Sequence, residues 1–443
     1  MRPEKRKSYL IRFLACILAL IAPIAYLRVL AGAGSLLQID LVQVFDGTHT
    51  ISDRSGTLLY DGECLEQDTV GNLVGTEGLI ANSLYNRYKD EMIVSGFNPL
   101  VGRDSLQGTS MQTTLMPLAD QIRIKNLYGS YDGACFAYNY ETGEVYIALS
   151  LPCGLGAGLR EGSMFNGCLD GTYVPASTMK ILTTICAVAQ NPDLVDFEFT
   201  CQKSLMLDDG NIVNCHDYHG KIDLSDALGH SCNCYMAALI QKLNVKETSR
   251  ILAQLGILNK GTEAVEDSLR GVMDKLSYAY GHTEFTSFKQ FQSVWGLIGQ
   301  GDTRANPVNM AMVAAAVANG GSVAQPYIME SIVNHGTKVA YEAPEAQTLT
   351  IIDASTARMV KMAWEIAVKD HYHNGAKPLD EVISLAKTGT AEEDGGINDR
   401  LLLGVMEAYK TAFFIIVEDS SDNNGLVFAV ANLLAETVGA LQQ

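Results

Sequence analysis

The sequence predicts an α+β protein in which one antiparallel sheet is flanked by helices, behind a single membrane-spanning helix. After the N-terminal segment, strand-like runs occur at both ends of the chain and helix-like runs lie between them, a distribution typical of the α+β class. The second observation is one long apolar run near the N-terminus, and the third is composition. Of 443 residues, 47% are hydrophobic and 19% are charged, which allows a large core and excludes an intrinsically disordered chain.

The N-terminal segment combines a basic flank with the longest apolar run. Residues 9–30 would extend about 33 Å as a helix, which is enough to cross a bilayer. Residues 1–28 contain six basic residues and one acidic residue, a net charge of +5, and since the total is −18 the remainder carries −23. Because basic flanks stay in the cytoplasm, we predict a cytoplasmic tail at 1–8, a transmembrane signal anchor at 9–30 and an acidic body outside the cell membrane.

Two alternatives stay open for this apolar segment. It can be a signal peptide cleaved after the small residues 31–33, or a helix buried in the core. The negative charge of the remaining chain argues against nucleic acid as a partner, because phosphate binding needs a basic surface.

The elements expected after the apolar run begin with a short strand that follows a turn, within residues 53–60. Two strand-like runs at 133–138 and 144–149 are separated by turn residues, which predicts a hairpin that opens the main sheet. The expected helices lie at 177–189, 224–243, 306–318 and 353–369. Further strands are expected at 383–387, 401–405, 412–417 and 426–432.

The ten cysteines fit an exported protein only in part. Setting aside Cys16 in the apolar run leaves nine, so at least one must be free. Cys201 and Cys215 bracket a polar stretch with a turn signal at 208–210, which favours a disulfide that closes a hairpin. Two alternatives stay open: a zinc site made by Cys201 with the Cys- and His-containing string 215–219, or a pair of buried free thiols.

Three short motifs with catalytic character occur in order along the chain. Ser177 and Lys180 form S-x-x-K at the start of a predicted helix, and Ser231 and Asn233 form S-x-N. The third motif, K-T-G-T, ends a predicted strand and consists of Lys387, Thr388, Gly389 and Thr390. The first two motifs are common by chance, but the ordered set on the expected elements is specific.

The first motif has the pattern of an activated serine nucleophile. Ser177 and Lys180 are three positions apart on a helix, so their side chains share one face. A serine hydroxyl needs a base, and a lysine with its usual pKa of about 10.4 is protonated at neutral pH. Burial and a neighbouring cation, for which Lys387 is the candidate, would lower that pKa. The backbone N–H groups of Ser177 and Thr390 can then stabilise an oxyanion.

The other two motifs supply a proton relay and substrate contacts. We expect Ser231 to pass a proton between Lys180 and a leaving amine, and Asn233 to hydrogen-bond a substrate amide. Gly389 has no side chain, so it leaves the strand edge open for a close approach of the substrate. Thr388 and Thr390 are alternate residues of one strand, so both hydroxyls can face a substrate carboxylate.

These motifs and their surroundings resemble the penicillin-binding proteins, serine acyltransferases that cross-link peptidoglycan. The resemblance covers about residues 50–435 and implies the penicillin-binding transpeptidase fold at 130–440, behind a short pedestal at 35–125. Similar stretches include Asp53-Arg54-Ser55-Gly56, Phe165-Asn166, His219-Gly220, Gly299-Gln300-Gly301, Asn306-Pro307 and Asn319-Gly320-Gly321. Two departures are Ala176, where the family usually has glycine, and the sequence 400–404, which replaces an aromatic-rich strand.

The resemblance implies a membrane-anchored D,D-transpeptidase of class B type. Ser177, Lys180 and Ser231 would be catalytic, and the partners would be peptidoglycan stem peptides, β-lactam antibiotics, the cell membrane and other cell-wall synthesis proteins. The alternatives are a D,D-carboxypeptidase or β-lactamase that admits water, a β-lactam sensor, and a non-catalytic scaffold. The sequence gives no evidence that a metal or an organic cofactor is required.

Overall fold

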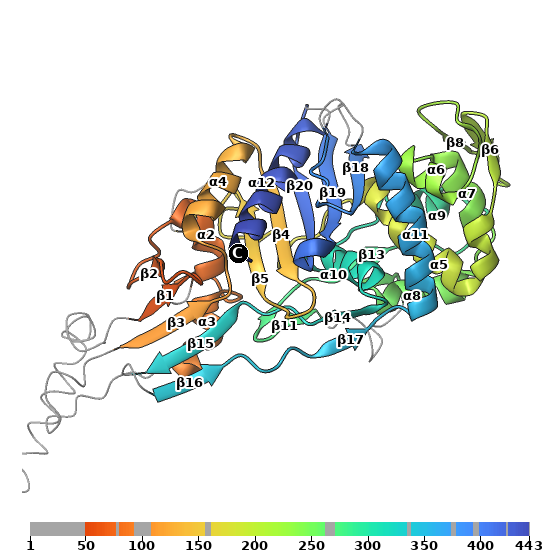
Figure 1. Cartoon of the computed structure of the whole chain (residues 1–443). Helices are drawn as coiled ribbons and strands as arrows, with labels where there is room; N and C mark the ends of the chain where they lie inside the picture. The colour runs from red at the N-terminus through yellow and green to blue at the C-terminus, as the bar shows by residue number, and fades with distance from the viewer. Residues whose placement is uncertain are drawn as a thin grey trace, which may run out of the picture.

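A five-stranded antiparallel sheet forms the centre of the computed structural model, with strand order β18-β19-β20-β4-β5 (Figure 1). The structure describes residues 49–442 except 77–78, 93–107, 156–160, 262–270, 335–337, 374–377, 393–397 and 422–423. The strands span Gly133–Asn139 (β4), Val145–Leu151 (β5), Leu385–Glu392 (β18), Asn398–Met406 (β19) and Thr411–Val417 (β20). The predicted hairpin at the start of this sheet is therefore present as β4 and β5, which pair antiparallel.

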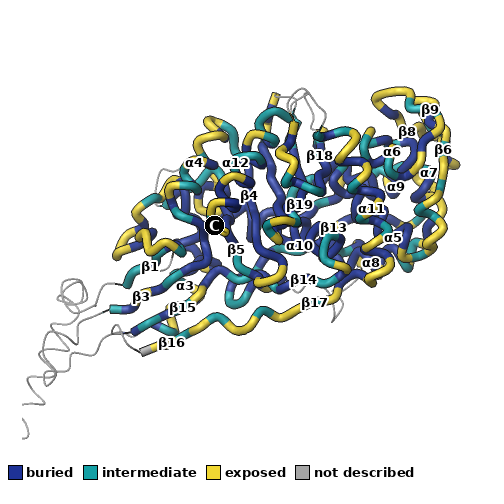
Figure 2. Tube along the Cα trace, in the orientation of Figure 1, coloured by how far each residue is buried: buried dark blue, intermediate teal, exposed yellow. Residues whose placement is uncertain are grey.

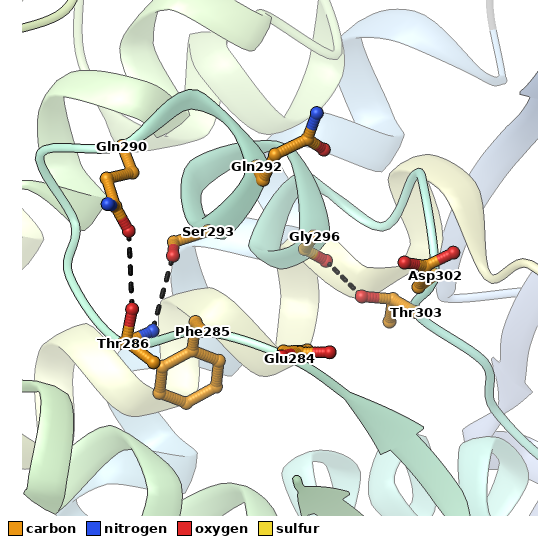
Figure 3. A pocket seen from close by; sticks show the side chains of 9 residues that line it. All are labelled: Glu284, Phe285, Thr286, Gln290, Gln292, Ser293, Gly296, Asp302 and Thr303. Atoms are coloured by element: carbon orange, nitrogen blue, oxygen red, sulfur yellow. Dashed lines mark hydrogen bonds between the residues drawn. The ribbon is translucent and has the colours of Figure 1, made fainter. Parts of the chain in front are cut away.

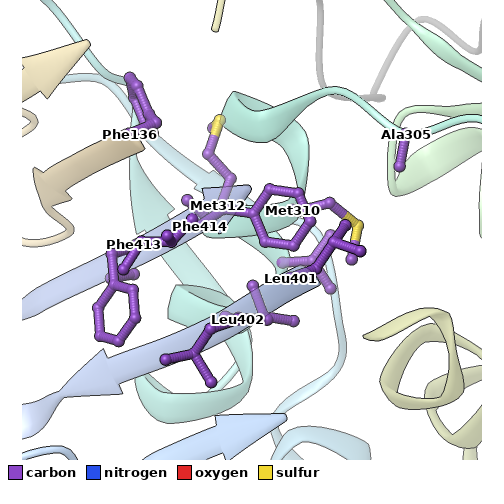
Figure 4. Packing of buried hydrophobic residues seen from close by; sticks show 14 of the residues in the cluster. Phe136, Ala305, Met310, Met312, Leu401, Leu402, Phe413 and Phe414 are labelled. Carbon is purple, nitrogen blue, oxygen red and sulfur yellow. The ribbon is translucent and has the colours of Figure 1, made fainter. Parts of the chain in front are cut away.

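The central strand β20 is apolar along nearly its whole length because both of its faces are covered. All seven of its residues are buried, and helices α10 (Pro307–Ala318) and α12 (Gly425–Leu441) both pack against it. Figure 4 shows Met310 and Met312 of α10 beside Phe414 and Phe136. Each such side chain contributes about 1.5–3 kcal/mol on burial, and the buried trace runs through the centre of the molecule in Figure 2.

A second five-stranded sheet, with order β16-β15-β3-β1-β2, lies beside the first. It combines three N-terminal strands with two strands from much later in the chain: Thr50–Ser52 (β1), Leu58–Tyr60 (β2), Thr109–Thr113 (β3), Met329–Asn334 (β15) and Lys338–Glu342 (β16). The N-terminal region is therefore tied to the main domain through the β3–β15 pair. Its helices are Gln67–Val74 (α2), Leu84–Tyr88 (α3) and Leu118–Tyr128 (α4).

The remaining helices pack at the other end of the main sheet, around α5. They are Met179–Gln190 (α5), Leu224–Gly229 (α6), Asn233–Ile240 (α7), Val245–Gln254 (α8), Phe291–Ile298 (α9) and Ala354–His371 (α11). Pairs of short strands border them: Phe199–Cys201 (β6) with Gly220–Ile222 (β9), Ser204–Met206 (β7) with Ile212–Asn214 (β8), Ile257–Asn259 (β10) with Gly281–Thr283 (β13), Val272–Met273 (β11) with Leu276–Ser277 (β12), and Ser322–Ala324 (β14) with Thr348–Thr350 (β17).

Two predicted elements are wrong. The helix expected at 224–243 is broken into α6 and α7, because Ser231 has the left-handed value φ 54° and ends the helical path. The strand expected at 426–432 is instead the first part of α12. Periodicity alone does not separate a short apolar run from a buried helix, and here the buried residues Val427, Val430 and Leu434 recur at helical spacing.

The predicted Cys201–Cys215 disulfide is absent, and both residues are free thiols. Cys201 of β6 pairs with Gly220 of β9, so Cys215 is not its strand partner. The N–H of Cys215 donates a 2.8 Å hydrogen bond to the carbonyl of Lys203. The two cysteines are not strand partners, but their sulfur atoms still lie within 4.8 Å of each other, in a cluster with His219 and Cys232.

The predicted cytoplasmic tail at 1–8 and the predicted anchor at 9–30 lie outside the described residues. Among the residues that are described, no helix is both long enough and apolar enough to cross a bilayer. The anchor therefore stays a prediction from sequence.

Candidate active site

The three motifs meet at one polar cleft of about 550 Å³ between the helical part and the edge of the main sheet. Ser177 precedes α5 in the 3-10 turn Ala176–Thr178 (η3), Ser231 and Asn233 lie at the break between α6 and α7, and K-T-G-T lies on β18. The motif residues that line the cleft are Ser177, Ser231, Asn233, Thr388, Gly389 and Thr390. Sequence reasoning therefore named residues that the fold brings together from segments more than 200 positions apart.

The turn that carries Ser177 is held by close backbone packing. Ala176, where the family usually has glycine, adopts φ 48°, a conformation that costs a non-glycine residue about 1–2 kcal/mol. Its N–H donates a 2.8 Å hydrogen bond to the carbonyl of Gly299. Gly299 has φ 100°, and a Cβ there would lie 1.9 Å from the carbonyl oxygen of Ala176. A Cβ on Gly389 would lie 3.1 Å from the carbonyl oxygen of Pro175, so this glycine lets β18 approach the turn.

The loop that carries Ser231 begins where α6 ends. The strained φ of Ser231 turns its carbonyl and hydroxyl toward α5, where both accept hydrogen bonds from Lys180. The next residue, Cys232, starts α7, and its sulfur accepts a hydrogen bond from the N–H of Tyr235 at 3.4 Å. Strain of this kind persists only where surrounding contacts fix the conformation.

Lys180 is fully buried and makes three hydrogen bonds through its Nζ atom. It donates to the carbonyl of Ser231 at 2.6 Å, to the Ser231 hydroxyl at 3.1 Å and to Oδ1 of Asn233 at 2.7 Å. Burial, and then the positive charge of Lys387, lower the pKa of Lys180 to about 7. A lysine with that pKa is neutral in a large fraction of molecules at neutral pH, as a general base requires.

Lys387 reaches the same serine from strand β18. It is also fully buried, and its Nζ donates to the Ser231 hydroxyl at 3.1 Å and to the carbonyl of Thr388 at 3.0 Å. Burial lowers the pKa of Lys387 to about 7. The Ser231 hydroxyl thus lies between two amines, an arrangement suited to passing a proton from one to another.

The strand edge contains residues that sequence reasoning missed. The Thr388 hydroxyl shares a 2.9 Å hydrogen bond with the hydroxyl of Tyr372, and the Thr390 hydroxyl accepts from Nη1 of Arg400 at 2.7 Å. Arg400 faces Thr390 across the β18–β19 pair, and its Nε is buried without a hydrogen-bond partner. The contact between Arg400 and Thr390 could have been predicted from an antiparallel pairing of the two strands, because residues that pair directly on adjacent strands have neighbouring side chains.

Other polar residues complete the cleft. Gln300 donates to the Thr390 carbonyl at 2.9 Å, and three histidines, His216, His230 and His371, also line the cavity. Burial lowers the pKa of His371, as does the neighbouring His230. A separate polar cavity of about 380 Å³, shown in Figure 3, contains none of the motif residues; its lining residues are Glu284, Phe285, Thr286, Gln290, Gln292, Ser293, Gly296, Asp302 and Thr303.

Comparison with known proteins identifies the family of the chain. The family model for the penicillin binding protein transpeptidase domain matches residues 133–435. The peptidoglycan D,D-transpeptidase PbpA of Mycobacterium tuberculosis is 25% identical over 384 residues, covering 76% of this chain and 72% of that protein. The peptidoglycan D,D-transpeptidase MrdA of Acinetobacter baumannii is 22% identical over 283 residues, covering 59% of this chain and 41% of that protein.

Solved structures show the same fold. The imipenem acyl-enzyme complex of penicillin-binding protein A from Mycobacterium tuberculosis matches with a TM-score of 0.73 and 21% identity, covering 91% of this chain and 100% of that chain. The D,D-transpeptidase domain of a peptidoglycan glycosyltransferase from Eggerthella lenta matches with a TM-score of 0.71 and 20% identity, covering 90% and 99%. Since the family model spans more than half of the chain, the resemblance found in the sequence is confirmed, and the chain belongs to the penicillin-binding protein transpeptidase family.

Proposed function

We propose that the protein is a membrane-anchored peptidoglycan D,D-transpeptidase of class B type that works through a Ser177 acyl-enzyme. The observation that carries this proposal is the buried Lys180, three residues after Ser177, with a pKa lowered to about 7 and a hydrogen bond to Ser231. Relatives named as peptidoglycan D,D-transpeptidases support the substrate class. We keep 35–125 as a pedestal and 130–440 as the catalytic domain.

The proposed reaction has two steps. Neutral Lys180 takes the proton of the Ser177 hydroxyl while Oγ attacks the carbonyl carbon of the D-Ala-D-Ala bond. The protonated Lys180 then gives a proton to the Ser231 hydroxyl, which passes its own proton to the amide nitrogen of D-Ala. The C–N bond breaks, D-Ala leaves, and the stem peptide is joined to Ser177 as an ester. An amine from a second strand then attacks the ester, its proton returns through Lys180, and the Ser177 hydroxyl is restored.

This function is tested by offering the full-length protein a donor peptide that ends in D-Ala-D-Ala, with and without a D-amino acid acceptor. We expect the exchanged peptide to be the main product when the acceptor is present, since the acyl group is transferred to an amine. Release of only the shortened acid, at a rate that the acceptor does not change, would favour the carboxypeptidase alternative. Absence of any product and any penicillin adduct would favour the non-catalytic scaffold.

The acylation rate should depend on pH through Lys180. Because the neutral amine is the base, the rate should rise with pH to a plateau above a midpoint near pH 7, and fall about tenfold for each pH unit below it. The measurement is the second-order rate constant for penicillin acylation from pH 5 to pH 9. Replacing Lys387 with methionine removes the neighbouring cation and should move the midpoint of any residual activity to higher pH. A midpoint near pH 10 in the wild type would contradict the lowered pKa of Lys180, and a rate that does not change with pH would contradict a base role.

Thr390→Val should weaken acylation by ligands that carry a carboxylate. The substitution keeps size and strand propensity but removes the hydroxyl that contacts Arg400. One hydrogen bond to a charged group contributes about 1.5–3 kcal/mol, which corresponds to a roughly 10- to 150-fold loss of acylation efficiency. The same loss is not expected with an amide-capped analogue. If the variant acylates with acid and amide ligands as fast as the wild type does, Thr390 is only a β-branched strand residue.

The proposed topology can be tested separately. A reporter fused after Ser35 should be active only if it functions outside the cytoplasm, because the +5 flank keeps residues 1–8 inside. A cytoplasm-only reporter that is active at the same position would reverse the orientation and would separate the catalytic domain from peptidoglycan.

A further inference from the structure

We propose that Cys201, Cys215, His219 and Cys232 bind one Zn²⁺ ion. Their ligand atoms, three sulfurs and one ring nitrogen, all lie within 4.8 Å of one another. Two of these separations are 3.8 Å, between the sulfurs of Cys215 and Cys232, and 3.6 Å, between the sulfur of Cys215 and Nδ1 of His219. Zinc–sulfur bonds of about 2.3 Å in a tetrahedron place sulfur atoms about 3.8 Å apart, so the cluster already has nearly the required size.

The surroundings favour a closed structural site. Cys201, Cys215 and Cys232 are buried, and only His219 is half-buried, with its ring stacked on that of His230 at 4.8 Å. Four protein ligands leave no open position for water or substrate, as in structural zinc sites. Thiolates combined with imidazole select zinc over magnesium or calcium, which prefer oxygen ligands.

The four ligands come from the ends of four different elements. Cys201 ends β6, Cys215 follows β8, His219 precedes β9, and Cys232 is the N-cap of α7. A metal ion there would join both short-strand pairs to the start of α7, a region where apolar packing is thin because several neighbouring side chains are exposed, including Met206, Ile212 and Tyr218. Three thiols lose their protons when the ion binds, so binding should weaken at acidic pH.

The position of Cys232 links this cluster to the active site. Cys232 lies between Ser231, which contacts Lys180 and Lys387, and Asn233, which contacts Lys180. An ion that fixes the Cys232 sulfur would therefore help to hold the strained Ser231 in place. This positioning role rests on the proposed function, whereas binding of the ion does not.

Zinc binding is tested on the full-length protein by measuring bound zinc after dialysis, and by the absorption spectrum after replacement with Co²⁺. We expect one zinc per chain, and a cobalt spectrum of the tetrahedral thiolate type. Cys232→Ala and His219→Ala should lower the zinc content, whereas Cys64→Ala, which removes a buried cysteine of the N-terminal region, should not. The cobalt spectrum of the wild type needs no variant, so misfolding of one substitution leaves the test intact.

The proposal is overturned if the wild type holds no more zinc than Cys232→Ala, or if zinc does not slow alkylation of the cluster thiols.

The positioning role is tested separately, by the rate of penicillin acylation. Removing the metal with a chelator should slow penicillin acylation, by up to about 100-fold for a displacement near 1 Å, and added zinc should restore the rate. If the metal is present but its removal leaves acylation unchanged, the role of the metal is limited to stability, and the proposed function is unaffected.

Discussion

Ser177→Ala is expected to abolish covalent labelling by penicillin while the fold survives. Ser177 is half-buried at the cleft, two residues before the start of the helix that carries Lys180, and no other hydroxyl holds this relation to a lysine within the three motifs. Removal of one oxygen from a half-buried turn leaves the packing of the main sheet untouched. The measurement is intact-mass spectrometry after exposure to penicillin, together with a thermal unfolding profile.

Ser249→Ala is the matched control for this variant. Ser249 lies buried on α8, and its hydroxyl has no hydrogen-bond partner, so alanine should be tolerated there with labelling unchanged. Retention of the adduct on another serine in Ser177→Ala would reject Ser177 as the nucleophile. Loss of labelling accompanied by unfolding would instead show that the turn is required for the fold.

Lys180→Ala should slow acylation by several orders of magnitude. Loss of a general base alone costs about 10²–10⁴-fold, and Lys180 also holds the carbonyl and hydroxyl of Ser231 through hydrogen bonds of 2.6 Å and 3.1 Å. Both the proton acceptor and the position of the relay would therefore be lost. The measurement is the rate of acylation under single-turnover conditions.

Lys180→Arg separates the two roles of this residue. A guanidinium can keep a hydrogen bond to Ser231 but cannot be deprotonated at working pH, so the variant should stay as slow as a base-free enzyme. Lys242→Arg is the matched control. The ammonium of Lys242 lies over the ring of Phe197, so this variant should acylate normally. A rate near wild type for Lys180→Arg would contradict the base role.

The sequence predicts those parts of the site in which the geometry of a motif depends only on residues close to one another in the chain. Ser177 and Lys180 depend on one helix turn, and Thr388 with Thr390 depends on one strand, so spacing alone indicates which side chains share a face. The strands β4, β5, β19 and β20 were predicted for a similar reason, because each is a short apolar run bounded by turn residues.

The missed parts depend on contacts distant in the sequence. The break at Ser231 is stabilised by Lys180, 51 residues earlier, and a local reading of the apolar run through residues 224–243 does not include that contact. The sequence marks Arg400 only as part of a departure from the family pattern, although its guanidinium contacts Thr390 on the neighbouring strand. The sequence favours a Cys201–Cys215 disulfide because it does not reveal that Cys232 and His219 share the same cluster.

The most direct measurement is a time course of the penicillin adduct on the full-length protein, followed by intact mass after free penicillin is removed. A transpeptidase whose ester is attacked by an amine and not by water should carry one adduct, on Ser177, that persists over many turnover times of a peptide substrate. Absence of the adduct, or its loss within a few such times in plain buffer, would contradict a transpeptidase and indicate a scaffold or a β-lactamase.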